Sequence, residues 1–241
     1  SLFYGWLATY DGLFVVGRTL CVLFGLAGIW LVYLLGRRVS GRESVGLVSA
    51  ALLTMNVFHL QLSRFYTVDV VLATICSGAL LVAVRLSTEW NYRLTVIGGA
   101  LLGFAAATKI SALSLLLPFF AAWLLYCSAQ RAFFSFKVFA AGVLLLVTGF
   151  LAFALAEPYA FLDSTQFIKD IREQTDMVKG LWRPPYTIQY EGTAPYFYHL
   201  KQIWHYTMGW PLALSAFAGV VLALFRQVRN RQAAETVLLV F

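Results

Sequence analysis

The sequence predicts an all-helical, polytopic membrane protein, and three observations lead to that fold class. The 241 residues are 61% hydrophobic and 12% charged, whereas a soluble domain carries about 45–50% apolar and about 25% charged residues. Apolar stretches recur along the whole chain, and about 20 such residues cross the roughly 30 Å of bilayer hydrocarbon as a helix. These stretches are continuous, whereas the strands of a membrane β-barrel alternate. The composition excludes a cytosolic enzyme, a secreted disulfide scaffold and a disordered tail.

We expect about seven complete transmembrane helices and part of an eighth. The predicted spans are Gly12–Gly36, Ser44–Ser63, Val70–Val84, Leu94–Thr108, Ile110–Gln130, Val138–Ala156 and Gln202–Phe225, with Glu235 to Phe241 beginning the eighth. Two spans have only 15 residues, which is roughly 22 Å at the rise of an α-helix. We therefore expect Asp69 and Lys109, which flank their outer ends, to lie at membrane depth.

The charges of the loops predict an orientation. One alternating set of loops holds ten basic and three acidic residues, the basic ones being Arg37, Arg38, Arg42, Arg85, Arg93, Arg131, Lys137, Arg226, Arg229 and Arg231. The other set includes the 64–69 turn and a long segment, Glu157–Lys201, with five basic and six acidic residues. Because basic loops stay in the cytoplasm, we place the second set outside the cell.

Residues 157–206 are predicted to form an extracytoplasmic loop within a single transmembrane domain that covers residues 1–241. Glu157 precedes a proline and should end a helix. Asp163 and Ser164 resemble a helix N-cap, and apolar residues then recur on one side up to about Gly180, which indicates an amphipathic helix. Many Trp and Tyr residues follow; an aromatic belt at the membrane interface and a wall for a sugar ring both stay open.

Four ionisable residues form the candidate site. Asp69 and three cations, Arg18, Arg64 and Lys109, are expected at similar depth on the outer side. Ionisable groups at membrane depth are costly and suggest function, although ion pairs between helices would also explain them. Arg and Lys bind phosphate through charge-assisted hydrogen bonds. Asp69 could also help to hold a divalent metal, but a Mg²⁺ site gathers more oxygen ligands than one carboxylate.

Four stretches resemble the GT-C glycosyltransferases of the glycosyltransferase 39 group, which includes protein O-mannosyltransferases and aminoarabinose transferases. The first is Tyr10-Asp11-Gly12 with Val16-Gly17-Arg18 and the Gly36-Arg37-Arg38 helix end. The second is Gln61 to Asp69, and the third is Gly103 to Lys109. The fourth joins Gln189-Tyr190 and Gly192 to Tyr198 with Met208 to Leu212.

The resemblance implies sugar transfer from a polyprenyl-phosphate-linked donor to an acceptor on the outer face of the plasma membrane. It implies that the essential acidic residue of the first outer loop lies upstream of Ser1, in a longer chain of which this is a fragment; Asp11 lies too close to the next helix to replace it. It carries over Asp69, Arg64 and Lys109, with Arg18 beside them, as donor-phosphate or metal-proximal candidates. It also points to a substrate loop containing Gln189, Tyr190, Thr193, Tyr196 and Tyr198.

Two other functions stay open. A non-catalytic membrane subunit or lipid-binding scaffold would explain why the expected carboxylate is missing. A transporter is less well supported, because its charged residues should lie in the middle of discontinuous helices. The sequence does not identify the sugar or distinguish among a protein, a lipid and a glycan as acceptor, and it contains no nucleic-acid signature.

Overall fold

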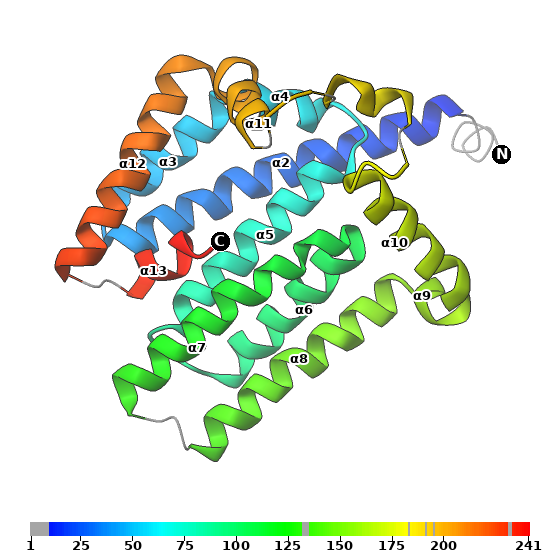
Figure 1. Ribbon diagram of the computed structural model, residues 1–241. Helices are drawn as coiled ribbons and strands as arrows, with labels where there is room; N and C mark the ends of the chain where they lie inside the picture. Colours follow the sequence, from blue (N-terminus) through cyan, green and yellow to red (C-terminus); the bar gives the residue numbers. More distant parts are fainter. Residues whose placement is uncertain (1–9, 132–134, 183, 191, 195, 231–232) are drawn as a thin grey trace.

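The computed structural model describes residues 10–131, 135–182, 184–190, 192–194, 196–230 and 233–241. Within these ranges the chain folds into helices and turns without a strand (Figure 1). This confirms the predicted all-helical fold class. The side chains at positions 10, 11, 186, 189, 190 and 228–230 lie outside the description, and they include those of Asp11, Gln189 and Tyr190.

The described helices follow one another with short connections. In chain order they are α2 (Tyr10–Ser40), α3 (Glu43–Thr54), α4 (Val57–Arg64), α5 (Val68–Leu86), α6 (Tyr92–Thr108), the 3₁₀ segment η1 (Ile110–Leu115), α7 (Leu116–Gln130), α8 (Phe136–Ala156), α9 (Tyr159–Leu162), α10 (Ser164–Val178), the 3₁₀ segment η2 (Pro185–Tyr190), α11 (Phe197–Gln202), the π-helical segment η3 (Ile203–Met208), α12 (Gly209–Asn230) and α13 (Ala233–Leu239).

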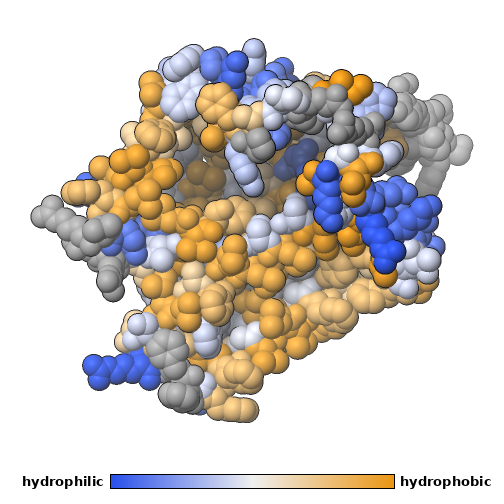
Figure 2. Space-filling model, viewed as in Figure 1, coloured by the Kyte–Doolittle hydropathy of each residue, from blue (hydrophilic) through white to orange (hydrophobic). Residues whose placement is uncertain are grey.

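Five helical segments of the described chain are long and apolar enough to cross a membrane. They are Gly12–Ser40, Val68–Leu86, Ile110–Gln130, Phe136–Ala156 and Phe197–Gln227. The bent pair α3–α4 would be a sixth, and α6 is a shorter apolar helix. Apolar residues dominate the surface over α5 to α8, while hydrophilic residues gather on α10 (Figure 2). The chain is therefore a multi-pass membrane protein, and the count of seven complete crossings stays a prediction.

Two predicted spans differ from the helices that the structure contains. The predicted span Ser44–Ser63 is not one helix, because it breaks at Met55 and Asn56 and bends by 63°. The side chain of Asn56 caps α4 by accepting a hydrogen bond from the backbone N–H of His59 at 2.9 Å. α5 begins two residues before and ends two residues after the predicted Val70–Val84, so it is a full-length span that includes Asp69.

The C-terminal segments also differ from their predicted boundaries. The predicted helix Gln202–Phe225 contains the π-helical segment η3 and then Gly209, whose φ of +71° suits glycine. The predicted eighth span begins as α13, seven residues from Ala233. α13 packs against α5, α7 and α12, and the buried carboxylate of Glu235 lies 3.6 Å from the Arg226 guanidinium.

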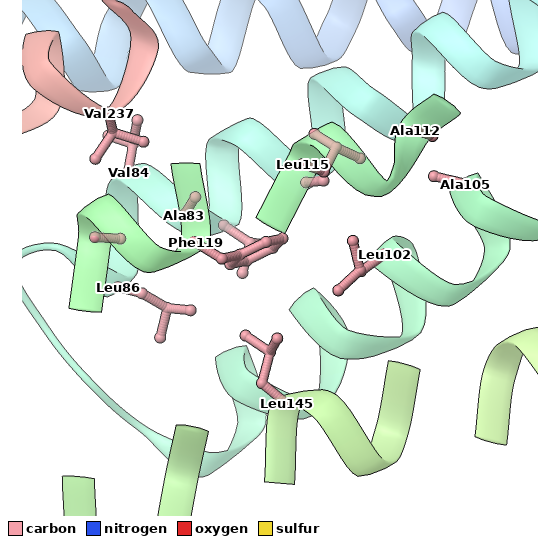
Figure 3. Packing of buried hydrophobic residues seen from close by; sticks show 13 residues of the cluster. Ala83, Val84, Leu86, Leu102, Ala105, Ala112, Leu115, Phe119, Leu145 and Val237 are labelled. Atoms are coloured by element: carbon pink, nitrogen blue, oxygen red, sulfur yellow. The ribbon is translucent and has the colours of Figure 1, made fainter. Parts of the chain in front are cut away.

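The core lies where α5, α6, α7 and α8 meet. Its fully or nearly fully buried side chains include Leu86, Phe119, Leu145 and Val237, which come from four different helices (Figure 3). α6 and α8 run parallel, because the backbone near Gly99 meets Leu145 and the backbone near Gly103 meets Gly149. Close backbone approach at small residues is the usual way in which membrane helices associate.

Two contacts place connections of the two predicted loop sets at opposite ends of the bundle. At one end, Arg38 in α2 lies 3.8 Å from Glu89 and donates a hydrogen bond of 2.9 Å to Thr88, so the α2–α3 and α5–α6 connections meet. At the other end, Asp69 in α5 meets Lys109 after α6. These contacts agree with the alternation of the loops. The assignment of the Arg38 end to the cytoplasm stays a prediction.

The amphipathic helix in the long loop is confirmed. α10 covers Ser164–Val178, and the Asp163 carboxylate caps it by accepting a hydrogen bond from the backbone N–H of Gln166 at 3.1 Å. On its apolar side, the Phe167 ring lies 6.3 Å from that of Phe153 near the end of α8. α8 ends at Ala156, directly before Glu157 as predicted.

Candidate functional site

The candidate site is built on the short turn between α4 and α5. α4 ends at Arg64, and Phe65 and Thr67 adopt extended backbone conformations before α5 begins at Val68. Asp69 therefore lies in the first turn of α5, where a carboxylate interacts favourably with the helix dipole. The turn fixes Asp69 at the end of the bundle opposite to the Arg38–Glu89 contact.

Asp69 and Lys109 form an ion pair across two helices. A carboxylate oxygen of Asp69 lies 3.6 Å from the Lys109 Nζ, and the two side chains are 48% and 57% exposed. Lys109 caps the C-terminus of α6 in an extended conformation, so its side chain leaves the helix there. An ion pair this exposed contributes only about 0–1 kcal/mol to stability. Both groups are therefore accessible to a ligand at little structural cost.

Helix α2 supports the turn through small residues. The Tyr66 ring packs against Gly17, where a Cβ atom would lie only 2.5 Å from the ring. One helical turn further on, the Cys21 thiol donates a hydrogen bond of 3.4 Å to the carbonyl of Thr67. The turn thus lies against the face of α2 that carries Gly17 and Cys21.

Arg18 lies beside this turn because its neighbour Gly17 contacts Tyr66. Its guanidinium carbon lies 5.6 Å from the centre of the Phe14 ring, a cation–π contact. The Phe14 ring in turn meets the Tyr66 ring edge-on at 6.2 Å. Arg18 is exposed, as is Arg64 at the start of the turn. Among the described residues neither arginine has a carboxylate within 4.0 Å.

The structure therefore brings together part of the predicted cation cluster. Asp69 and Lys109 form an ion pair. Arg18 and Arg64 flank the same turn, and among the described residues neither forms an ion pair with Asp69. The turn and its neighbours thus carry three exposed cations and one exposed carboxylate, a net positive charge that suits a phosphate. The roles of these residues stay a prediction.

The residues of the predicted substrate loop are only partly described. The side chains of Gln189 and Tyr190 lie outside the described residues. Tyr196 is 81% exposed and has a φ of +64°, an uncommon conformation for a residue with a side chain. Thr193 and Tyr198 are half-buried, and the Tyr198 ring lies 5.6 Å from that of His199.

An aromatic cluster beside α4 was missed as a unit by the sequence analysis. η3 packs against α4, the helix that ends in Arg64. The ring of Trp210 lies 5.5 Å from that of Trp204 and 5.2 Å from that of His205. The indole N–H of Trp204 is buried, and the described part of the chain offers it no hydrogen-bond partner. The π-helical turn and Gly209 assemble this cluster, and no simple periodicity signals it.

The described residues do not fit a divalent metal at Asp69. They contain no group of three or more His, Cys, Asp or Glu side chains arranged to hold an ion. Asp69 also has an ammonium group within 3.6 Å, whereas Mg²⁺ requires several oxygen ligands. We therefore derive no step through a metal ion, and metal binding at Asp69 stays a prediction.

A helical, multi-pass chain with a cation-rich patch at one end fits the GT-C class of membrane glycosyltransferases. The model of the dolichyl-phosphate-mannose-protein mannosyltransferase family matches residues 10–155, which is more than half of the chain, and the chain belongs to this family. The match covers Arg18, Arg64, Asp69 and Lys109, and it ends before the predicted substrate loop. No curated protein and no solved structure matches the chain.

Proposed function

We propose that the chain transfers a sugar from a polyprenyl-phosphate-linked donor to an acceptor outside the cytoplasm, with Lys109, Arg64 and Arg18 binding the donor phosphate. The single observation that carries the proposal is the exposed Asp69–Lys109 pair beside the turn that α2 supports. The family is named for mannose transfer from a lipid-linked donor to protein.

The chemistry explains why such a site needs cations. A lone pair of the acceptor oxygen forms the new bond to the anomeric carbon, and the bond from that carbon to the phosphate oxygen breaks. The electron pair of the broken bond leaves with the lipid phosphate, so negative charge grows there as the transition state forms. Cations placed before the reaction stabilise that charge, which is the largest contribution in many enzymes.

Asp69 is proposed as a positioning residue. Its carboxylate holds the Lys109 ammonium within 3.6 Å and so directs it toward the phosphate. The acceptor hydroxyl must also lose its proton to a base. We assign that base to none of the described residues; the resemblance implies that a carboxylate upstream of Ser1 would supply it.

The test compares two ion pairs of similar length and exposure at opposite ends of the protein. In the full-length protein, we expect Asp69→Asn and Lys109→Gln each to reduce transfer from a labelled polyprenyl-phosphate sugar by about 100-fold, a typical loss for one electrostatic contact in a transition state. Glu89→Gln removes the matched partner of Arg38 and should leave transfer unchanged.

Two results would overturn the proposal. Wild-type turnover in both Asp69→Asn and Lys109→Gln would remove these residues from the site. Donor binding without any transfer by the full-length wild-type protein would favour the non-catalytic, lipid-binding scaffold. Thermal melts of the same detergent-solubilised variants show whether each is folded, so a loss of turnover can be separated from a loss of structure.

A further inference from the structure

A second site emerges from a groove between α7 and α8. The groove encloses about 490 Å³, and aromatic and aliphatic side chains line it, including Phe119, Phe120 and Trp123 of α7 and Phe139 and Leu146 of α8. Phe119 also belongs to the core, so the floor of the groove is fixed (Figure 3). α7 packs on α5 and α8 packs on α6, which leaves the space between α7 and α8 open. The apolar groove fits an acyl chain.

A smaller, more polar pocket adjoins the groove at the arginine-rich end of the bundle. It encloses about 220 Å³ and shares Trp90 with the groove as a common wall. Its polar lining consists of the side chains of Tyr92, Tyr126, Ser135 and Lys137. The rings of Trp90 and Tyr126 lie 5.8 Å apart, so the pocket has a defined aromatic side.

Two residues that line the pocket, Trp90 and Lys137, carry hydrogen-bond donors, and neither donor is paired with a carboxylate among the described residues. The Trp90 indole N–H is buried, and no hydrogen-bond partner for it is found in the described chain. An indole N–H can only donate, and a lysine ammonium carries three donors and no acceptor. Lys137 has no carboxylate within 4.0 Å among the described residues. A buried donor that stays unpaired costs about 1–3 kcal/mol, so an anionic acceptor would stabilise the site.

We propose that this groove and pocket bind one anionic phospholipid, with an acyl chain along α7 and α8 and the phosphate beside Lys137 and the Trp90 N–H. The charge of the pocket selects an anionic headgroup, and the apolar groove selects a lipid over a free phosphate ion. The lipid would fill the space that α7 and α8 leave between them and join the two helices.

This inference does not rest on the proposed function. Lys137 lies in the first turn of α8 next to the start of α6, and Lys109 follows the end of α6. The 17 residues of α6 separate the two sites by roughly 25 Å at the rise of an α-helix. A lipid at Lys137 therefore lies at the opposite end of the bundle from the proposed donor phosphate.

The headgroup is tested by native mass spectrometry of the full-length protein with phosphatidylglycerol and phosphatidylcholine of the same acyl chains. We expect the wild-type protein to retain phosphatidylglycerol about tenfold better, which corresponds to one charge-assisted hydrogen bond. Lys137→Gln should abolish that preference, and Trp90→Phe, which keeps an aromatic ring and removes the N–H, should weaken it. Lys169→Gln on the exposed surface of α10 is the matched charge control and should have no effect.

The acyl chain is tested by filling the groove. At Gly142 of α8 a Cβ atom would have only Trp123 within 4 Å, at 4.0 Å, so Gly142→Leu fits without a clash and occupies the groove. We expect it to reduce retention of both lipids severalfold. Gly219→Leu on α12, where a Cβ meets nothing within 4 Å, makes the same change outside the groove and should not. Equal retention of the two lipids by the wild-type protein, or an unchanged preference in Lys137→Gln, would overturn the proposal.

Discussion

Two helix contacts in this protein use small residues, and they differ in what those residues meet. In the α6–α8 contact the glycines meet backbone: a Cβ atom at Gly103 would lie 2.2 Å from the carbonyl oxygen of Gly149, and one at Gly99 would lie 2.4 Å from that of Leu145, beside the Thr148 hydroxyl. In the α2 contact, Gly17 and Gly25 face the side chains of Tyr66 and Ser63 on the α4–α5 segment. The first contact joins two helix backbones, and the second makes room for side chains of a polar turn.

The difference separates a contact that holds the fold from one that shapes the site. On the α6–α8 side, the hydroxyl of Thr148 lies against Gly99, but it donates its hydrogen bond to its own helix at Leu144, 2.8 Å away. On the α2 side, the turn that packs against Gly17 and Cys21 leads directly to Asp69. Small residues in a membrane helix can therefore serve either to pack two helices or to position a site, depending on which groups lie opposite them.

The largest effect is expected at Gly103. In Gly103→Ala the new methyl group would meet backbone atoms of Gly149 and Phe153, which cannot rotate away. We expect a loss of about 2–4 kcal/mol in stability, within the range of overpacked cores, and a large fall in the thermal midpoint of the solubilised protein.

Gly142→Ala is the matched control for Gly103→Ala. It adds the same methyl group to α8, where only the end of the Trp123 side chain lies as close as 4.0 Å. Alanine also favours a helix over glycine by about 1 kcal/mol, so the control should be unchanged or slightly more stable. A similar loss in both variants would show that the close backbone contact does not matter.

A smaller loss of stability, but a loss of activity, is expected at Gly17. In Gly17→Ala the methyl group meets the Tyr66 ring at 2.5 Å, and a side chain on a turn can move aside. We expect about 1 kcal/mol of destabilisation, together with about a tenfold fall in sugar transfer because the displaced turn carries Asp69.

A double-mutant cycle isolates the contact between Gly17 and Tyr66. In the Tyr66→Ala background the methyl group of Gly17→Ala has no ring to meet, so the second substitution should have little further effect on transfer. If the two effects simply add, Gly17 does not act through Tyr66 and the positioning role of α2 is wrong.

The smallest effect is expected at Thr74, which tests the α2 contact farther from the site. Its buried hydroxyl donates a hydrogen bond of 2.8 Å to the Phe24 carbonyl, across from α5 to α2. Thr74→Val keeps the shape and removes this bond, so we expect about 1 kcal/mol of destabilisation and unchanged transfer. A thermal melt and a turnover assay on the same preparation check both expectations, and a tenfold loss of transfer would extend the site-shaping region to this position.

Local signals in the sequence predicted the helices well. The Asp163 cap and the apolar side of α10 are properties of neighbouring residues, and the structure has both. The break at Asn56 was missed because the apolar run continues through it, although Asn before Val57 is itself a cap signal. A hydropathy pattern reports how long and how apolar a segment is, and a bend in the helix changes neither property.

The candidate site was predictable only in outline. The expected common depth of Asp69 and Lys109 agrees with their contact, because both follow from where helices begin and end. Which cation lies against the carboxylate depends on how α5 and α6 pack, so the same reasoning could not separate Lys109 from Arg64. The cluster of Trp204, His205 and Trp210 depends on a π-helical turn, for which the sequence carries no simple period.

The bend between α3 and α4 has a consequence for the surrounding bilayer. α3 and α4 have 12 and 8 residues and meet at 63°. Together they span at most roughly 26 Å from end to end, whatever their tilt in the membrane. The 21 residues of α8 span roughly 32 Å. The hydrocarbon thickness that matches α3 and α4 is therefore smaller than the thickness that matches α8. Lipid adapts to such a mismatch by thinning locally, so the two leaflets should approach each other more closely along α3 and α4, where Arg64 ends the shorter helix, than along α8.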